Sequence, residues 1–206
     1  MTEKTISRLT KKVFRTSLLA RRKQLFESSA QLNVEVSMHF LKLLKQVRPK
    51  TLGLYRPIRS EPNLIEVSWR WQKESGALLY LPETRRDCMV YRRWFEGADL
   101  LKDCAGISYA PGEEALESLD MVVAPCVGYT ESCRRLGYGG GYFDRYLAAC
   151  GDRRPMVVGV AFDELLVSDE IFEIFDEPLD VVVTERRILK NEESAAIAAL
   201  RRINER

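Results

Sequence analysis

The residues with the clearest chemical potential lie in one glycine-rich stretch that follows a buried apolar strand. Four glycines stand within five positions there: Gly137, Gly139, Gly140 and Gly141. Three arginines bracket the run: Arg134, Arg135 and Arg145. Glycines let backbone N–H groups approach phosphate oxygens, the amino terminus of a following helix adds its dipole, and arginines form charge-assisted contacts with phosphate. The stretch therefore predicts a phosphate-binding loop.

The spacing of these glycines leaves the kind of phosphate ligand open. A Walker loop requires Gly-Lys-Ser/Thr after its glycines, and no such tripeptide occurs. A dinucleotide loop requires Gly-x-Gly-x-x-Gly, whereas Tyr142 follows the glycines here. A tight glycine-rich turn with no ligand is the alternative interpretation.

Hydrolytic chemistry based on histidine is disfavoured by the composition. The only histidine, His39, lies in an apolar, helix-like stretch, where a packed or solvent-edge side chain is expected. The five cysteines are an odd number and include no Cys-x-x-Cys pair. Neither a disulfide framework nor a zinc site is therefore indicated.

The elements that must position the loop alternate between helices and strands. Helices are predicted over residues 4–28, 31–47, 62–74, 143–150 and 191–206. Strands are predicted over residues 51–55, 77–81, 88–95, 121–124, 156–161 and 179–184. Residues 97–112 are rich in loop-forming residues. This alternation indicates an α/β domain with a mostly parallel sheet, in which ligands bind beyond the carboxyl ends of the strands.

The first predicted helix is basic and amphipathic. Its apolar positions recur at roughly helical spacing: Ile6, Leu9, Val13, Leu18 and Leu25. Residues 1–50 hold 12 basic and 3 acidic side chains (+9), and residues 51–206 hold 20 and 27 (−7), which sums to +2. The basic segment predicts a surface that faces an anion or a partner. A solvated helix face and a nucleic-acid-binding segment over residues 8–23 are the alternatives.

Length and composition indicate one globular domain. The chain has 206 residues, of which 46% are hydrophobic and 30% charged, enough apolar material for a single core. No apolar run approaches the roughly 20 residues that a membrane-spanning helix needs, and no secretory leader opens the chain. We expect one domain over residues 1–206, with a charged, fraying tail over residues 191–206, in the cytoplasm.

Residues 135–145, Arg-Leu-Gly-Tyr-Gly-Gly-Gly-Tyr-Phe-Asp-Arg, closely resemble the signature of the 5-formyltetrahydrofolate cyclo-ligase family, also called 5,10-methenyltetrahydrofolate synthetase. Lys11-Lys-Val-Phe-Arg15 looks like a second family element, and Ser60-Glu61 after a strand looks like its substrate loop. The resemblance extends over about residues 8–188. It implies a three-layer α/β/α sandwich with a mostly parallel sheet, of the sugar-phosphate isomerase and CoA-transferase type.

The resemblance also implies an activity. The family closes 5-formyltetrahydrofolate into 5,10-methenyltetrahydrofolate, with Mg²⁺ as cofactor and ATP as co-substrate, and releases ADP and phosphate. In its proposed route the γ-phosphoryl group moves to the formyl oxygen, N10 attacks the activated carbon, and phosphate leaves. Such chemistry mainly requires positioning and charge neutralisation. The implied partners are these small molecules, with no nucleic acid and no membrane, and the implied state is a monomer.

Site residues follow from the resemblance position by position. The implied ATP-binding residues are Lys11, Arg15, Arg135, Gly137, Tyr138, Gly139, Gly140, Gly141, Tyr142, Phe143 and Arg145. The implied folate-binding residues are Tyr55, Arg56, Glu61, Gly140 and Tyr142. The implied magnesium carboxylates are Asp144 and Asp176.

The chain departs from the usual family pattern at Thr130, Leu165 and Phe175, where the family commonly has aspartate, glutamine and histidine. These departures thin the polar groups expected near the second substrate. They favour, as the alternative function, a non-catalytic regulator of the same fold that binds folate or nucleotide.

Overall fold

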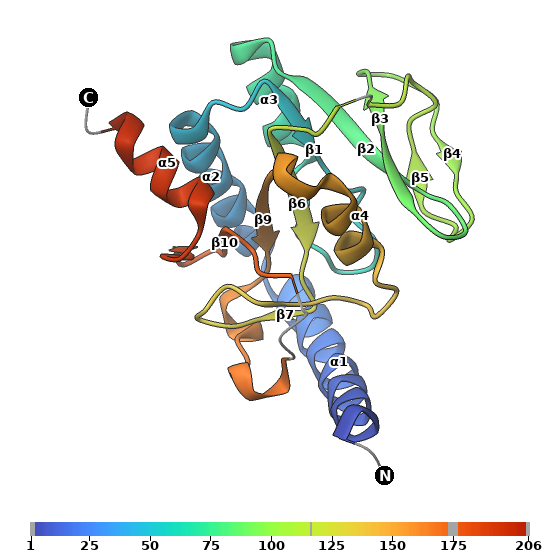
Figure 1. The fold of residues 1–206 in the computed structure, drawn as a ribbon, viewed down its shortest axis with the longest axis vertical. Helices are drawn as coiled ribbons and strands as arrows, with labels where there is room; N and C mark the ends of the chain where they lie inside the picture. Colours follow the sequence, from blue (N-terminus) through green and yellow to red (C-terminus); the bar gives the residue numbers. More distant parts are fainter. Residues whose placement is uncertain (1–2, 116, 173–176, 205–206) are drawn as a thin grey trace.

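A seven-stranded sheet forms the centre of the computed structural model, which describes residues 3–115, 117–172 and 177–204 (Figure 1). The strand order is β11-β10-β9-β6-β1-β2-β3. These strands are β1 (Thr51–Gly53), β2 (Leu78–Thr84), β3 (Met89–Trp94), β6 (Met121–Pro125), β9 (Met156–Val160), β10 (Val181–Val183) and β11 (Ile188–Lys190). The five inner strands run parallel, and β3 and β11 pair antiparallel at the two edges.

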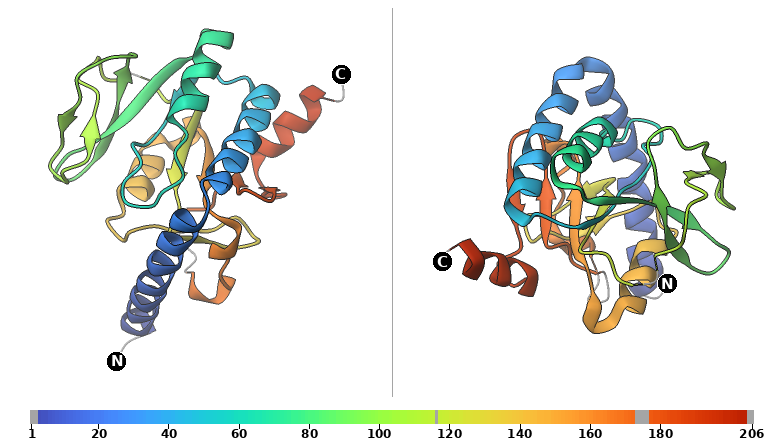
Figure 2. Two further views of the ribbon diagram at one scale, coloured as in Figure 1. Left: turned by 180° about the vertical axis from the view of Figure 1, so that it is seen from behind. Right: turned by 90° about the horizontal axis from the view of Figure 1, so that it is seen from above.

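Helices cover both faces of this sheet. They are α1 (Glu3–Ser28), α2 (Ala30–Val47), α3 (Ile65–Ser75), α4 (Tyr142–Cys150) and α5 (Ala195–Asn204). Helices α1, α2 and α3 lie on one side of the sheet and α4 on the other, as the views from the front and from above show (Figures 1 and 2). The predicted α/β/α arrangement of layers is therefore confirmed.

The central strands are apolar because helices cover them on both sides. Every residue of β6 and of β9 is buried, and the two strands pair in register from Met121 with Met156 to Pro125 with Val160. A parallel strand buried on both faces reads as a continuous hydrophobic run. That run is the reason why the sequence pattern located both strands.

The structure corrects the start of α3, which was expected at Pro62 and begins at Ile65. The carbonyl of Pro62 accepts a hydrogen bond from the Tyr55 hydroxyl at 2.6 Å, which holds this segment out of helical geometry. The Asn63 side chain then accepts the Ile65 N–H at 3.0 Å, which satisfies the first N–H of the helix although its N-cap residue, Leu64, makes no side-chain cap. These local hydrogen bonds accompany a helix start three residues after Pro62, despite the preference of proline for a first helical turn.

Several short elements lie in stretches where no strand or helix was expected. They are the hairpin strands β4 (Leu101–Lys102) and β5 (Ser108–Tyr109), the pair β7 (Gly128–Tyr129) and β8 (Arg135–Leu136), and the 3₁₀ turns η1 (Gly151–Arg153), η2 (Asp163–Leu165) and η3 (Asp169–Ile171). Two or three residues are too few to show a hydrophobic period, so such elements leave no sequence signal. The edge strand β11 was missed for the same reason.

The buried face of α1 differs from the predicted apolar stripe. Val13, assigned to that stripe, is 69% exposed. Leu18 and Leu25 of the predicted stripe are buried, and over residues 11–28 they share the buried face with Lys11 and Arg22 at helical spacing. Two cations on the buried face of a helix require an anionic or polar environment, which the site described below provides. Among the described residues, no helix is both long and apolar enough to span a bilayer.

Candidate functional site

A cavity of about 330 Å³ lies between α1, the glycine loop (residues 137–141) and the β2–β3 hairpin, beyond the carboxyl ends of β1 and β6. Its volume falls in the range of small-molecule sites. The lining residues that the sequence predicted are Lys11, Arg15, Tyr55, Arg56, Glu61, Arg135, Gly137, Tyr138, Gly139, Gly140, Gly141, Tyr142, Phe143 and Asp144. The fold thus brings the predicted ATP and folate positions to one cavity.

Two predicted site residues are not among those lining residues. Arg145 donates from Nη1 to the Gly140 carbonyl at 3.1 Å, and its guanidinium lies 4.7 Å from the centroid of the Tyr142 ring. It therefore braces the glycine loop from outside the cavity lining. Asp176 lies outside the described residues.

An apolar wall completes the cavity, and sequence reasoning missed it. Its members are Ile58, Pro82, Met89, Ala105, Ile107 and Phe172. They come from four separate segments, none of which carries a recognisable motif. The Asp103 carboxylate accepts the Ile107 N–H at 2.8 Å and the Thr84 N–H at 2.9 Å, which holds Ile107 at the cavity. This pair of bonds ties the β4–β5 hairpin to the end of β2.

The glycine loop is shaped by close approaches of arginine side chains. Arg15 donates from Nε to the Gly137 carbonyl at 2.7 Å. A Cβ at Gly139 would stand 3.3 Å from Arg15 Cζ, and one at Gly137 would stand 2.5 Å from Arg135 Nη1. Glycine at both positions therefore makes room for the two guanidinium groups. The loop ends at Gly141, whose left-handed φ of 66° precedes the first turn of α4.

Three cationic side chains from α1 and β8 line the cavity close to the glycine loop. Lys11 and Arg15 reach it from α1, and Arg135 reaches it from β8. Arg135 stacks over the Phe143 ring at 4.9 Å, and its Nη2 lies 3.6 Å from Asp144 Oδ1. The Asp144 side chain is 45% exposed, so its carboxylate remains accessible beside these cations. Three cations around a glycine loop suit a polyphosphate group.

A buried carboxylate, that of Glu61, also lines the cavity. Glu61 accepts the Ile58 N–H at 2.8 Å on Oε2 and the Tyr138 hydroxyl at 2.8 Å on Oε1. Burial raises the pKa of Glu61 above its usual value, although these hydrogen bonds and nearby arginines oppose the shift. Burial likewise raises the pKa of Tyr138 to about 12, so its hydroxyl keeps its proton at neutral pH. Glu61 is thus a strong acceptor for a polar ligand group.

Arg22 lies directly behind this carboxylate and was missed by the sequence reasoning. Its guanidinium is fully buried, and its Nη1 lies 3.9 Å from Glu61 Oε1. A signal was present in the sequence, because Lys11, Arg15 and Arg22 recur at helical spacing along α1. Cations at i, i+4 and i+11 share one helix face. They share it here with the buried Leu18 and Leu25.

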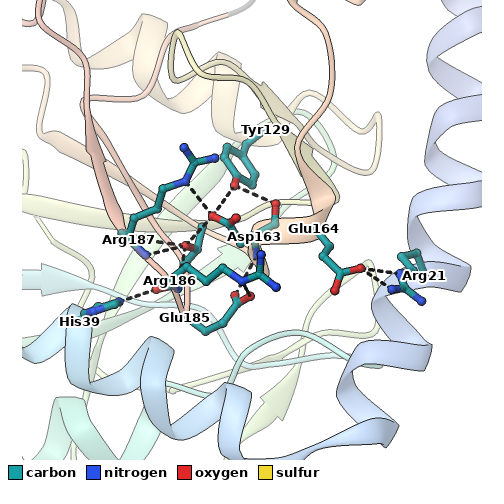
Figure 3. Close-up of polar contacts among 9 residues, drawn as sticks. Arg21, His39, Tyr129, Asp163, Glu164, Glu185, Arg186 and Arg187 are labelled. Carbon is teal, nitrogen blue, oxygen red and sulfur yellow. Dashed lines mark hydrogen bonds and ion pairs between the residues drawn. The ribbon is translucent and has the colours of Figure 1, made fainter.

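A second polar cluster lies near the carboxyl ends of β9 and β10, and Figure 3 shows its side chains converging on Asp163. Asp163 Oδ1 accepts from Arg187 Nε at 2.8 Å, the Thr184 hydroxyl at 3.1 Å and the Tyr129 hydroxyl at 3.1 Å. Burial alone would raise the pKa of Asp163, but these bonds hold it below its usual value. We call this set the Asp163 cluster. None of its four members lines the cavity.

His39 contacts the same region from α2. Its Nδ1 lies 2.8 Å from the Thr184 carbonyl oxygen, and the side chain is half-buried (Figure 3). This placement agrees with the expectation of a packed or solvent-edge histidine, and His39 is not among the lining residues of the cavity.

Thr130 and Leu165, the two of the named departures from the family pattern that the structure describes, lie apart from the cavity. Thr130 and Leu165 are both fully buried and are not among its lining residues. Thr130 accepts the Arg134 N–H at 3.1 Å and is 2.9 Å from the Ser132 hydroxyl, which makes it part of a turn. Phe175 lies outside the described residues. Neither described departure removes a polar group from the cavity.

The fold and the cavity together define a class. The protein is an α/β protein with an open, mostly parallel sheet and a small-molecule cavity at the carboxyl ends of its strands, with a glycine loop and clustered arginines.

Comparisons with known proteins identify the family within this class. The family model described as the 5-formyltetrahydrofolate cyclo-ligase family matches residues 8–185. A 5-formyltetrahydrofolate cyclo-ligase of Mycolicibacterium smegmatis is 29% identical over 183 residues, which are 84% of this chain and 91% of the relative. That of Haemophilus influenzae is 27% identical over 162 residues, or 74% of this chain and 86% of the relative.

Solved structures agree. The NMR structure of a 5,10-methenyltetrahydrofolate synthetase from Aquifex aeolicus superposes with a TM-score of 0.76 at 27% identity, covering 89% of this chain and 94% of that one. The synthetase from Mycoplasma pneumoniae has the same fold, with a TM-score of 0.65 at 22% identity over 85% of this chain and 98% of that one. The chain belongs to the 5-formyltetrahydrofolate cyclo-ligase family, and it is an enzyme.

Proposed function

We propose that the cavity binds ATP and 5-formyltetrahydrofolate together and closes the folate into 5,10-methenyltetrahydrofolate, with Mg²⁺ as cofactor. The observation that carries this proposal is the convergence of three cations and a glycine loop with a buried carboxylate in one cavity of about 330 Å³. A triphosphate requires the first set of groups, and a polar heterocycle requires the second. The family membership supplies the reaction that joins them.

The triphosphate lies, in this proposal, against Lys11, Arg15 and Arg135. Backbone N–H groups of the glycine loop and the amino terminus of α4 face the same phosphates. Arg145 contributes indirectly, because it holds the Gly140 carbonyl and packs on Tyr142. This division of roles separates arginines that contact the phosphates from one that shapes the loop.

Asp144 is the described carboxylate that fits a Mg²⁺ ligand. It lines the cavity, is partly exposed, and stands beside Arg135 where the phosphates would lie. Mg²⁺ commonly takes only one or two protein carboxylates, with phosphates and waters completing its octahedron. A bound Mg²⁺ would neutralise charge on the phosphate oxygens.

The folate ring lies against the apolar wall with Glu61 accepting from its amino and ring N–H groups. Tyr55, Arg56 and Tyr142 also line the cavity. The formyl group then faces the γ-phosphate. The formyl oxygen attacks phosphorus, the bond to the bridging oxygen breaks, and ADP leaves. N10 attacks the formyl carbon, phosphate departs with the former formyl oxygen, and the N10 proton passes to water.

We infer that the protein acts as a monomer in the cytoplasm on these small molecules, without nucleic acid or membrane partners. Two basic residues of α1, Lys11 and Arg15, are directed to the cavity. This arrangement uses the positive charge that would otherwise suggest a nucleic-acid partner.

The test measures formation of methenyltetrahydrofolate by its absorbance. We expect product only when the formyl folate, ATP and Mg²⁺ are all present. Calorimetric titration with each substrate alone and in the presence of the other provides the binding constants. Tight folate binding with no consumption of ATP would contradict the proposal and favour a non-catalytic regulator.

A further inference from the structure

Arg22 has the largest fully buried side chain among the described residues, and it joins three segments behind the cavity. Its Nε donates to the Ser60 hydroxyl at 3.4 Å, and its Nη1 donates to the Cys126 carbonyl at 3.3 Å. Its Nη2 donates to the Tyr138 hydroxyl. A buried guanidinium is costly unless its donors are satisfied and an anion lies nearby. Glu61, 3.9 Å from Nη1, is that anion.

The Tyr138 hydroxyl connects the two charged groups. It accepts from Arg22 and donates to Glu61 Oε1 at 2.8 Å. Tyr138 belongs to the glycine loop, whereas Glu61 belongs to the segment that follows β1. Arg22 therefore touches both the carboxylate on the folate side and the loop on the phosphate side, yet it does not itself line the cavity.

We propose that Arg22 is a positioning residue, which keeps the Glu61 carboxylate charged and directed into the cavity and links it to the glycine loop through Tyr138. The inference rests on the proposed function, because it requires that Glu61 contacts the folate. Arg22 acts through Glu61 and touches neither substrate. Its removal must therefore affect folate binding more than ATP binding.

The charges around Glu61 make Arg22 the decisive cation. Arg22 faces Glu61 from α1, Arg59 from the same loop, Tyr138 from the glycine loop, and Tyr55 and Cys126 from the ends of β1 and β6. Both arginines lower the pKa of Glu61, but Arg59 is exposed to solvent and Arg22 is not. Solvent screens an exposed charge. Loss of Arg22 therefore raises the pH at which Glu61 becomes protonated.

The experiment compares Arg22→Met, Arg22→Lys, Glu61→Gln and the double variant Arg22→Met/Glu61→Gln. Arg21→Met is the matched control, because Arg21 is adjacent on α1, about half exposed (48%) and bonded to Glu164 outside the cavity. Dissociation constants for 5-formyltetrahydrofolate and for ATP are measured by calorimetry between about pH 5 and pH 8, a range that spans titration of a carboxyl with a raised pKa. Melting temperatures are recorded for every variant.

We expect Arg22→Met to weaken folate binding roughly tenfold to a hundredfold, because a charge-assisted network around a buried carboxylate is broken. ATP affinity should change less than about threefold, since phosphate contacts remain. The acid-side loss of folate affinity should move to higher pH in Arg22→Met and return towards the parent in Arg22→Lys. In the Glu61→Gln background, Arg22→Met should add little, because the two act as a unit.

The outcomes separate this inference from the proposed function. If Glu61→Gln binds the folate as the parent does, the proposed role of Glu61 is wrong and the inference falls with it. If Glu61→Gln weakens folate binding and Arg22→Met does not, only the inference is wrong. Equal losses for both substrates with an unshifted pH profile would also overturn it, by assigning Arg22 a purely structural role. Should Arg22→Met not fold, the folate affinity and pH profile of Arg22→Lys decide the question.

Discussion

The cavity and the Asp163 cluster use the same residue types in opposite ways. In the Asp163 cluster, the carboxylate is 14% exposed and meets an arginine at 2.8 Å together with two hydroxyl donors. In the cavity, Asp144 is 45% exposed with its arginine at 3.6 Å, and Glu61 is buried with its arginine at 3.9 Å. In the Asp163 cluster, the hydrogen-bonding capacity of the carboxylate is used by neighbouring side chains. In the cavity, the carboxylates keep acceptor capacity for a ligand.

The pKa directions express the same difference. Hydrogen bonds hold the pKa of Asp163 below its usual value despite its burial, whereas burial raises the pKa of Glu61 despite its hydrogen bonds. A carboxylate with a lowered pKa stabilises the fold, and one with a raised pKa destabilises it until a ligand or proton arrives. A carboxylate in a cavity whose pKa is shifted in the direction that destabilises the fold is typical of a functional site.

The largest expected effect tests the cavity side of the comparison. Asp144→Asn should lower kcat/KM by about a hundredfold or more, because it removes a metal-binding charge beside the reacting phosphates. The melting temperature should stay near that of the parent, since Asp144 is partly exposed. Asp152→Asn, an exposed aspartate just beyond α4, is the matched control. Full activity of Asp144→Asn at limiting Mg²⁺ would contradict the proposed role of Asp144 as a metal ligand.

The second effect tests the Asp163 cluster. Asp163→Asn should lower the free energy of unfolding by about 2 kcal/mol at neutral pH, through the loss of charge-assisted hydrogen bonds. Because the lowered pKa favours folding only above the unfolded value of about 4, the difference from the parent should shrink as the pH falls through the folded-state pKa. Denaturant unfolding at several pH values measures this difference.

The catalytic rate of folded Asp163→Asn should remain close to that of the parent, in contrast to Asp144→Asn. Glu164→Gln is its matched control, because Glu164 pairs with Arg21 at the surface and such a pair contributes less than about 1 kcal/mol. A large loss of activity with unchanged stability in Asp163→Asn would contradict the structural role that we assign to the Asp163 cluster.

A smaller effect distinguishes arginines within the cavity region. Arg135→Ala should weaken ATP binding roughly tenfold, because a cation that faces the phosphates is lost. Arg145→Ala should weaken it only about twofold to threefold, since Arg145 braces the Gly140 carbonyl and loses a largely neutral contact. Calorimetric titration with ATP ranks the two variants. Equal effects would show that our division of the arginines is wrong.

The smallest effect concerns stability against pH at Glu61. Because its pKa is raised in the folded state, ionised Glu61 opposes folding above that pKa, and the cost disappears as the pH falls towards the unfolded value. Glu61→Gln leaves Arg22 without its anion at every pH, so the prediction concerns the pH dependence: relative to the parent, the melting temperature of Glu61→Gln should be about a degree or two higher at pH 7 than at about pH 4. Thermal unfolding at the two pH values checks the sign, which is opposite to that for Asp163→Asn.

Much of the site was predictable because its parts are local. The glycines at 137 and 139–141, the flanking Arg135 and the buried strand β6 are close in sequence, and each leaves a compositional signal. Asp144 was implied only by the resemblance to the family. Helices α1 and α2 were also located, because their periods extend over many residues. The apolar wall was not predicted, because Met89, Ile107 and Phe172 carry no pattern that marks them as neighbours.

The sequence by itself determined which residues can face a phosphate and that an α/β sheet would hold them at one edge, since backbone freedom at glycine and hydrophobic period are local properties. Only the tertiary structure decided that Arg22 is buried while Val13 is exposed, and that Tyr138 reaches a carboxylate 77 positions away. Burial and charge pairing depend on contacts between distant segments, and the dielectric environment that sets the pKa of Glu61 exists only once those segments have packed together.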